Sequence, residues 1–213
     1  MSAITPALDL YGAGLRGDAA ELWARRRDGT RVRLPLDRWL GPLTDADADL
    51  LDRARAPVLD IGCGPGRHVL ALAHRGVMAL GIDVSQVAVA HARSRGAAAI
   101  EASVFERVPG AGRWGSALLL DGNVGIGGCP VRLLRRLRML VEPGGAILVE
   151  LEPPGVASGA EELRLEHGGE RSAWFPWAWV GVDGVAATAA DAGLTVTDAW
   201  ERSGRWFAAL AQP

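Results

Sequence analysis

The sequence contains no lysine, because all 23 of its basic residues are arginine. This absence excludes enzymes that form a Schiff base on a lysine and nucleotide-binding proteins that depend on a P-loop lysine. Positive charge is not in excess either, since the formal net charge is −2. Binding to a phosphate backbone needs a basic surface. We therefore expect no nucleic-acid partner.

Cysteine and long apolar runs are also scarce. The two cysteines, Cys63 and Cys129, lie far apart and match no common metal-ligand spacing, so we expect no metal site. The sequence does not decide whether the two cysteines form a disulfide, although free thiols in a reducing cytoplasm are the simpler expectation. No apolar run reaches the roughly 18 residues of a membrane-spanning helix, and no basic-then-apolar leader is evident. We expect a soluble, cytoplasmic protein without membrane contact.

Short apolar segments alternate with helical patterns through the middle of the chain. Strands are expected at 58–61, 77–83, 97–104, 115–121 and 146–152, and helices at 44–56, 66–76, 85–96 and 130–141. This alternation is typical of a parallel sheet covered on both faces. The stretch 9–17, with three glycines, is expected to be a loop.

The last third of the chain departs from this alternation. A hairpin is expected at 162–175, a helix at 182–193, and two antiparallel strands at 194–200 and 205–211. The predicted fold is α/β, with a doubly wound, mostly parallel seven-stranded sheet. It has an antiparallel C-terminal strand, helices on both faces and a small inserted hairpin.

The segment "VLDIGCGPGRHV", residues 58–69, places three glycines directly after an expected strand. In an open parallel sheet, ligands bind beyond the carboxyl ends of the strands, where glycines let the backbone approach closely. A plain tight turn would explain the glycines alone. Asp83, however, ends the next strand about 20 residues later, where an acid accepts the ribose hydroxyls of an adenosine ligand. Together they indicate an adenosine-containing ligand.

The spacing argues against a dinucleotide. The dinucleotide fingerprint is G-x-G-x-x-G, and this loop has Arg67 where the last glycine would stand. Pro65 also removes one of the backbone N–H groups that bind a pyrophosphate. A nicotinamide-dependent oxidoreductase is therefore disfavoured, and the absence of any Tyr-x-x-x-Lys pair points the same way.

Four segments in order resemble the motifs of the class I S-adenosylmethionine-dependent methyltransferases. These are "VLDIGCGPGRH", "GIDVS", "GSALLLDGNVGIG" and "LVEPGGAILVE", spread over roughly residues 57–152. The resemblance implies S-adenosyl-L-methionine as cofactor. It also implies one domain, with an N-terminal helical extension or lid (1–56), a cofactor-binding core (57–152), an inserted hairpin and aromatic lid (153–181), and a closing helix and strand pair (182–213).

The resemblance also implies cofactor-binding residues. Asp60 would reach the methionine amino group, Asp83 the ribose hydroxyls, and Val84 the adenine. Ser103 stands where the family often has an aspartate for the adenine amine, which is a departure from the pattern. The other residues implied are Gly62, Cys63, Gly64, Gly66, Val104, Asp121 and Gly122.

Residues outside these motifs are weaker candidates. Tyr11 and Arg16 could fold over the cofactor, with Arg16 pairing with its carboxylate; the alternative is a solvated loop. Asn123 follows the fourth strand, where substrate contacts are common, but is equally suited to a turn. Trp174 and Trp177 belong to an aromatic cluster that suits a substrate lid. A small satellite core or the interface of a homodimer would explain the cluster equally well.

The predicted function is methyl transfer from S-adenosylmethionine to a small molecule, such as a secondary metabolite. The alternative is a protein that binds S-adenosylmethionine on the same fold without transferring methyl, such as a cyclase, a decarboxylase or a non-catalytic partner. No catalytic base is assigned. His68 follows the glycine loop and could face the pocket, but the expectation for an early helix residue is a surface or capping histidine.

Overall fold

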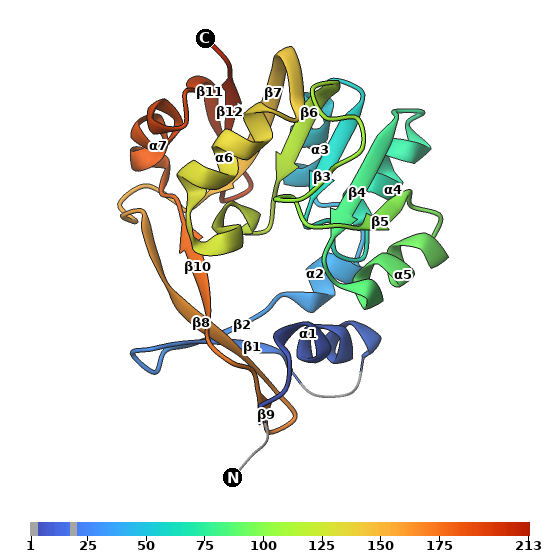
Figure 1. Ribbon diagram of the computed structural model, residues 1–213, viewed down its shortest axis with the longest axis vertical. Helices are drawn as coiled ribbons and strands as arrows, with labels where there is room; N and C mark the ends of the chain where they lie inside the picture. Colours follow the sequence, from blue (N-terminus) through green and yellow to red (C-terminus); the bar gives the residue numbers. More distant parts are fainter. Residues whose placement is uncertain (1–3, 18–20) are drawn as a thin grey trace.

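The computed structural model describes residues 4–17 and 21–213, and a seven-stranded sheet forms the upper part of the molecule (Figure 1). Its strands are β3 (Val58–Ile61), β4 (Ala79–Asp83), β5 (Ala99–Glu101), β6 (Trp114–Leu119), β7 (Val141–Leu151), β11 (Thr195–Arg202) and β12 (Arg205–Ala211). Their order is β11-β12-β7-β6-β3-β4-β5. Strands β3 to β7 pair in parallel, and β12 is antiparallel to its neighbours. The predicted doubly wound sheet with an antiparallel C-terminal strand is confirmed.

Helices cover both faces of this main sheet. They are α3 (Asp45–Asp52), α4 (Arg67–His74), α5 (Gln86–Ser94), α6 (Pro130–Arg138) and α7 (Val185–Asp191). Successive residues of β6 point to opposite faces, as in any strand. Leu118 packs in the cluster of α3 and α4, and Leu119 packs in the cluster of α6 and α7. The fully apolar strands of the sequence are therefore strands buried on both faces.

The predicted helix starts are confirmed where the sequence offers a cap. The Thr44 hydroxyl accepts a hydrogen bond from the Asp47 N–H at 3.2 Å, and Asp47 accepts one from the Thr44 N–H at 2.8 Å. This reciprocal pair is a capping box. The Ser85 hydroxyl accepts from the Ala88 N–H at 3.3 Å, and Pro130 occupies the first turn of α6.

The expectation of a loop at 9–17 is wrong, because helix α1 (Ala7–Arg16) spans most of it. Glycine in a helix costs about 1 kcal/mol relative to alanine, and tertiary packing outweighs that cost here. A Cβ on Gly12 would lie 2.9 Å from Val87 of α5, and a Cβ on Gly14 would lie 3.1 Å from Leu36. The glycines therefore serve close approach between α1 and its neighbours.

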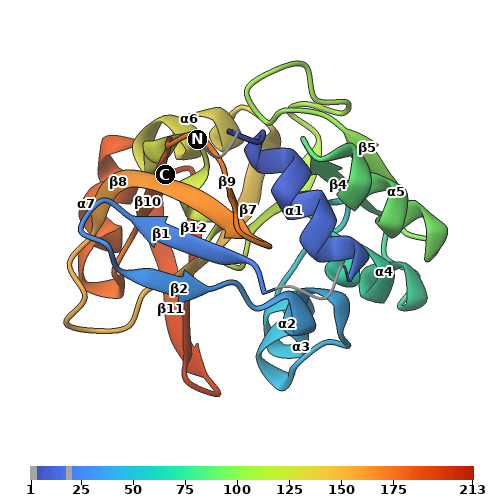
Figure 2. The ribbon, with the colours of Figure 1, turned by 90° about the horizontal axis from the view of Figure 1, so that it is seen from below.

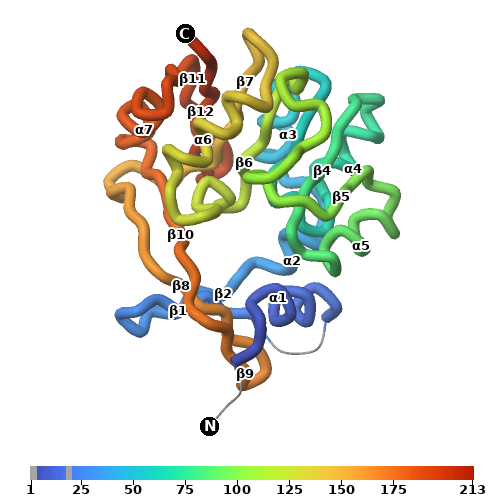
Figure 3. The backbone as a smooth tube through the Cα atoms, in the orientation of Figure 1, coloured from blue at the N-terminus to red at the C-terminus, as the bar shows by residue number. Residues whose placement is uncertain are grey.

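A second sheet, only partly predicted, lies below the main sheet in Figure 1 and faces the viewer in Figure 2. Its elements are β1 (Trp23–Arg26), β2 (Arg31–Arg33), β8 (Gly159–His167), β9 (Glu170–Arg171) and β10 (Phe175–Trp179). The order is β10-β8-β1-β2, and β9 pairs with β8 as the expected hairpin. The pairing of β1 with β8 joins the N-terminal segment to the insertion, and Figure 3 shows both segments side by side. Helix α2 (Leu36–Leu40) leads back to the main sheet.

Glycines let the second sheet approach the core. They lie in a 3-10 helix, η1 (Asn123–Gly128), directly after β6. A Cβ on Gly125 would lie 2.2 Å from the Ala178 carbonyl oxygen, and one on Gly128 would lie 2.6 Å from Pro176. Both neighbours belong to β10. The glycine-rich segment after β6 is therefore a docking surface for β10 as well as a loop at the end of the main sheet.

Two further expectations concern membranes and cysteines. Among the described residues, no helix is both long and apolar enough to cross a membrane. Both cysteines are free, with Cys63 buried and Cys129 exposed. The alternative of a disulfide between them is therefore wrong.

Candidate active site

A cavity of about 520 Å³ lies between the carboxyl ends of the main-sheet strands and the second sheet. Small-molecule sites typically have volumes of about 300–1,000 Å³. One wall consists of the loops after β3, β4, β5 and β6, and the opposite wall consists of α1 and the second sheet. The cavity thus lies where the topology of a parallel sheet predicts a ligand.

The glycine loop after β3 has the strained backbone that its sequence predicts. Gly62, Gly64 and Gly66 all have positive φ, at 66°, 53° and 81°. Only glycine adopts such angles readily. Gly62 and Gly64 line the cavity. Gly66 does not, because it begins α4 and packs against Ala92 and Ala97, where a Cβ would lie 2.8 and 3.0 Å from their methyl groups.

Asp83 lines the cavity at the end of β4, next to the glycine loop. Its carboxylate accepts hydrogen bonds from the Gly64 N–H at 2.9 Å and the Ser85 N–H at 2.8 Å. Burial raises the pKa of Asp83, and the two N–H groups offset part of that effect. The acid therefore fastens the loop to β4 in addition to facing the cavity.

His68 is buried between two carboxylates, so the expectation of a surface or capping histidine is wrong. Its Nε2 lies 3.4 Å from Asp47 and its Nδ1 lies 3.5 Å from Asp60. Burial alone would lower the pKa of His68, but the two carboxylates outweigh it and raise the pKa to about 9. His68 is therefore an imidazolium at neutral pH and cannot serve as a base. Asp60 Oδ2, also buried, has no hydrogen-bond partner among the described residues.

Asp47 is the centre of a buried ionic network that the sequence did not reveal. It accepts hydrogen bonds from Arg67 of α4 and, at 2.7 Å, from Arg205 of β12. Burial would raise the pKa of Asp47, but His68, Arg67 and Arg205 outweigh it and hold the pKa well below its usual range. Arg205 also binds Glu150 of β7 through two hydrogen bonds of 2.8 Å.

The same network reaches the cavity at Asp121, which has a positive φ of 55° after β6. Its carboxylate pairs with Arg67 at 2.9 Å and with Arg38 of α2 at 2.8 Å. Burial would raise the pKa of Asp121, but Arg67, His68 and Arg38 outweigh it and lower the pKa. Arg205 lies 3.7 Å from the same carboxylate, so Asp121 is an ionised group paired with three arginines. Gly122 does not line the cavity.

Tyr11 of α1 closes the cavity over the glycine loop. A Cβ on Gly64 would lie 3.0 Å from the Tyr11 hydroxyl, and the Tyr11 ring meets Trp39 edge-on at 6.0 Å. Burial, reinforced by the nearby Asp83 carboxylate, raises the pKa of Tyr11, which is a neutral phenol. Arg16, the other N-terminal candidate, is exposed and does not line the cavity.

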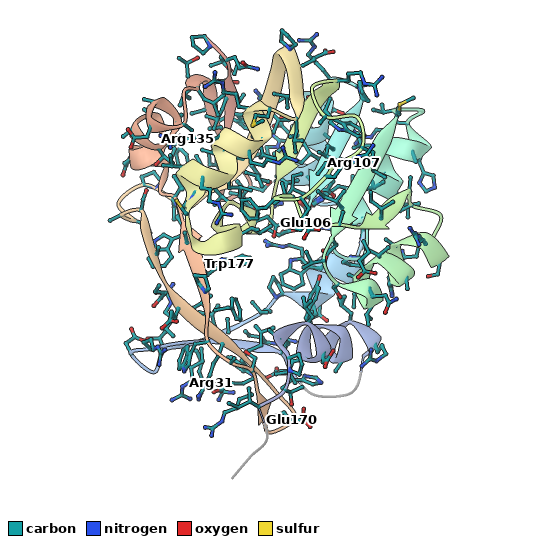
Figure 4. All side chains as sticks on the ribbon, in the orientation of Figure 1. Arg31, Glu106, Arg107, Arg135, Glu170 and Trp177 are labelled. Carbon is teal, nitrogen blue, oxygen red and sulfur yellow. The ribbon has the colours of Figure 1, made fainter. Side chains whose placement is uncertain are left out.

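Asn123 lines the cavity and also clamps the glycine loop. Its side-chain amide donates hydrogen bonds to the carbonyls of Ile61 and Gly62, both at 2.9 Å. Trp177 lines the cavity from β10, at the junction of the two sheets (Figure 4). Trp174 does not line it, and instead stacks under Arg27 and Arg164. The remaining predicted residues that line the cavity are Cys63, Val84, Ser103 and Val104.

Cys63 lines the cavity as an unreactive thiol. It packs against Gly81, where a Cβ would lie 2.5 Å from the sulfur atom. Burial, together with the nearby Asp60 and Asp83, raises the pKa of the Cys63 thiol far above its usual range. Thiolates are the reactive form of cysteine. Cys63 therefore contributes shape to the site and not a nucleophile.

We expect the buried imidazolium of His68 to make stability depend on pH. Its contribution is complete below the unfolded-state pKa of about 6.5 and is lost as the pH rises through about 9. The loss amounts to about 2–4 kcal/mol in the free energy of unfolding, measurable by urea denaturation between pH 6 and 10.

A His68→Gln variant should lack this slope, since glutamine does not titrate. His74→Gln, at an exposed position on the same helix, is the control and should retain it. An unchanged slope in His68→Gln would assign the pH dependence to another group.

Comparison with known proteins agrees with this geometry. Residues 58–145 match the family model described as "Methyltransferase domain". One similar structure is an S-adenosylmethionine-dependent methyltransferase from Bacteroides fragilis, crystallised with S-adenosyl-L-homocysteine. Its sequence is 21% identical to this chain, the TM-score is 0.79, and the alignment covers 99% of this chain and 98% of that one. DesVI from Streptomyces venezuelae is 17% identical with a TM-score of 0.61, covering 99% and 100%.

Another similar structure is an amino pentose methyltransferase from Micromonospora echinaspora that is involved in calicheamicin biosynthesis. It is 20% identical with a TM-score of 0.61, covering 83% of this chain and 94% of that one. No curated protein matches the sequence. The chain has the fold of the class I methyltransferases, and its residues 58–145 match the methyltransferase-domain model. The predicted family and enzyme class are thereby confirmed.

Proposed function

We propose that this protein transfers a methyl group from S-adenosylmethionine to a small-molecule acceptor inside the cavity. The observation that carries the proposal is the division of one cavity into two unlike walls. The glycine loop, Asp60 and Asp83 form a polar wall, and α1 with the second sheet forms an apolar wall. A charged adenosine ligand suits the first, and an acceptor suits the second.

The residues of the polar wall fit the cofactor. The buried Asp60 Oδ2 has no hydrogen-bond partner among the described residues and faces only the His68 imidazolium, at 3.5 Å. A buried carboxylate oxygen that accepts no hydrogen bond needs an explanation, and a cationic ammonium group in the cavity supplies one. The N–H groups of Gly64 and Ser85 orient the Asp83 carboxylate, which can also accept hydrogen bonds from ribose hydroxyls. Similar structures also support the cofactor predicted from the sequence. The Bacteroides fragilis structure contains S-adenosyl-L-homocysteine, and a further similar structure, the glycopeptide N-methyltransferase MtfA, contains S-adenosyl-L-methionine.

S-adenosylmethionine supplies a methyl group that is already activated on a sulfonium sulfur. The protein therefore needs mainly to position an acceptor and exclude water. Asn123 holds the loop in place, and Tyr11 covers Gly64 from α1. Trp177 and Phe175 close the far side from the second sheet. A small acceptor is supported by the size of the cavity and by relatives such as the calicheamicin amino pentose methyltransferase.

Calorimetric titration of the purified protein with S-adenosylmethionine, S-adenosylhomocysteine and NADH tests the proposal. We expect micromolar binding of the two sulfur compounds and no binding of NADH. Binding of none of the three would reject the cofactor assignment. S-adenosylhomocysteine release in the presence of an acceptor distinguishes methyl transfer from the alternative, a protein that binds the cofactor for other chemistry.

A further inference from the structure

The acceptor wall of the cavity offers hydrocarbon and aromatic surface almost throughout. Its described residues from the second sheet and the turn after β2 are Ala24, Leu34, Leu163, Leu165, Phe175 and Trp177. Helix α1 adds Ala7, Leu8 and Tyr11. Within this set of described residues, no side chain carries a charge, and the one hydroxyl is that of Tyr11, which lies against Gly64 of the glycine loop.

Such a wall discriminates against polyhydroxylated acceptors. Burying a hydroxyl without a hydrogen-bond partner is unfavourable, so each sugar hydroxyl placed here lowers affinity. Aromatic rings gain affinity instead, because pairs of aromatic rings attract each other beyond the effect of their buried area. Phe175 and Trp177 already meet edge-on at 6.3 Å, and the Trp177 ring is seated against Gly125. The aromatic surface is thus held in place.

The titratable side chains that line the cavity are unsuited to removing a proton from an acceptor. His68 is an imidazolium between Asp47 and Asp60, and Asp121 is paired with Arg38 and Arg67. The other titratable side chains that line the cavity are Tyr11 of α1, Asp60 of β3, Cys63 of the glycine loop, Arg67 of α4 and Asp83 of β4. None of the described lining residues of the second sheet is titratable. An acceptor that contacts this sheet therefore meets no general base.

We propose that the acceptor is a hydrophobic, ring-bearing molecule whose nucleophile has a free lone pair at neutral pH: a thiol or a heteroaromatic nitrogen, and not an alcohol or a sugar. The inference rests on the proposed function. A bond forms from the nucleophile to the methyl carbon, and the bond from that carbon to the sulfonium sulfur breaks. The electron pair of the broken bond stays on sulfur. A thiol loses its proton to water, and a heteroaromatic nitrogen has none to lose.

Binding to the protein loaded with S-adenosylhomocysteine tests the apolar wall. The probes are 2-naphthalenethiol, quinoline, 2-naphthalenemethanol and methyl glucoside. We expect the three ring compounds to bind at least about 10-fold more tightly than the glucoside, since several buried hydroxyls would lack partners. Equal affinity for the glucoside, or no binding of the ring compounds, would overturn the proposal.

Phe175→Gln places a polar group on the wall and should weaken binding of the naphthalene probes by about 10-fold. Its control is Trp174→Gln, the neighbouring aromatic outside the cavity, which should bind the probes as the parent protein does. Both variants should keep the parent affinity for S-adenosylmethionine. Equal effects of the two substitutions would overturn the assignment of this wall to the acceptor.

Turnover tests the nucleophile. With S-adenosylmethionine at pH 7, mass spectrometry should detect methylated 2-naphthalenethiol or quinoline, with kcat/KM at least about 10-fold above that of 2-naphthalenemethanol, which requires a base. Faster methylation of 2-naphthalenemethanol than of the thiol or quinoline would overturn the assignment of the nucleophile. Binding of the probes without methylation of any of them would overturn it as well. If S-adenosylmethionine itself does not bind, the proposed function fails; if it binds and the glucoside is preferred, only the present inference fails.

Discussion

Replacing Asp47 with alanine is expected to lower the free energy of unfolding by about 3–5 kcal/mol, the cost of breaking a buried charge pair. The Asp47 side chain is fully buried and binds Arg67, His68 and Arg205 from two different elements of the main sheet and its helices. Its loss leaves buried cations without their shared anion and also removes the capping box of α3. Denaturation in urea, followed by circular dichroism, measures the change.

Asp45→Ala is the matched control for this experiment. Asp45 occupies the first turn of the same helix but is exposed. Surface substitutions usually change stability by less than about 0.5 kcal/mol. A similar small loss in both variants would contradict the assignment of Asp47 as the centre of the network. A loss restricted to Asp47→Ala supports it.

Replacing Asp83 with alanine is expected to weaken binding of S-adenosylmethionine by about 10-fold or more, as for hydrogen bonds to a charged group worth about 1.5–3 kcal/mol. Two effects add. The ribose hydroxyls lose their carboxylate, and the Gly64 N–H loses the acceptor that fixes the glycine loop. Calorimetric titration of the variant measures the affinity directly.

Glu101→Ala supplies the comparison for Asp83→Ala. Glu101 ends the neighbouring strand β5 but is exposed and does not line the cavity. Its removal should leave the affinity for S-adenosylmethionine unchanged. Unchanged affinity in Asp83→Ala as well would reject the ribose assignment and leave Asp83 as a residue that only supports the loop.

The main sheet and the polar wall of the site could be predicted because their signals are local. Each buried strand is a short apolar run, and its helix begins at a recognisable cap such as Ser85 or Pro130. Parallel topology then requires the loop after β3 and the end of β4 to meet. Gly62, Gly64 and Asp83 were therefore predicted as cavity residues from spacing alone.

The second sheet and the ionic network could not be predicted because their signals are distributed along the chain. Strand β2 reads "RVR" and is exposed at every position, so no alternation identifies it. Its sheet exists because β1 pairs with β8, more than a hundred residues away. His68 looked like a surface residue because only folding brings Asp47 and Asp60 to its two sides.

The sequence by itself determined the class of fold, the glycine loop and the acid that faces it, since apolar periodicity and backbone freedom are properties of neighbouring residues. Only the tertiary structure decided the acceptor side. The apolar wall is assembled from α1, β1, β8 and β10, none of which could bury its side chains alone. The charge state of His68 was decided in the same way, because the pKa of a buried group depends on the charges that the fold places around it.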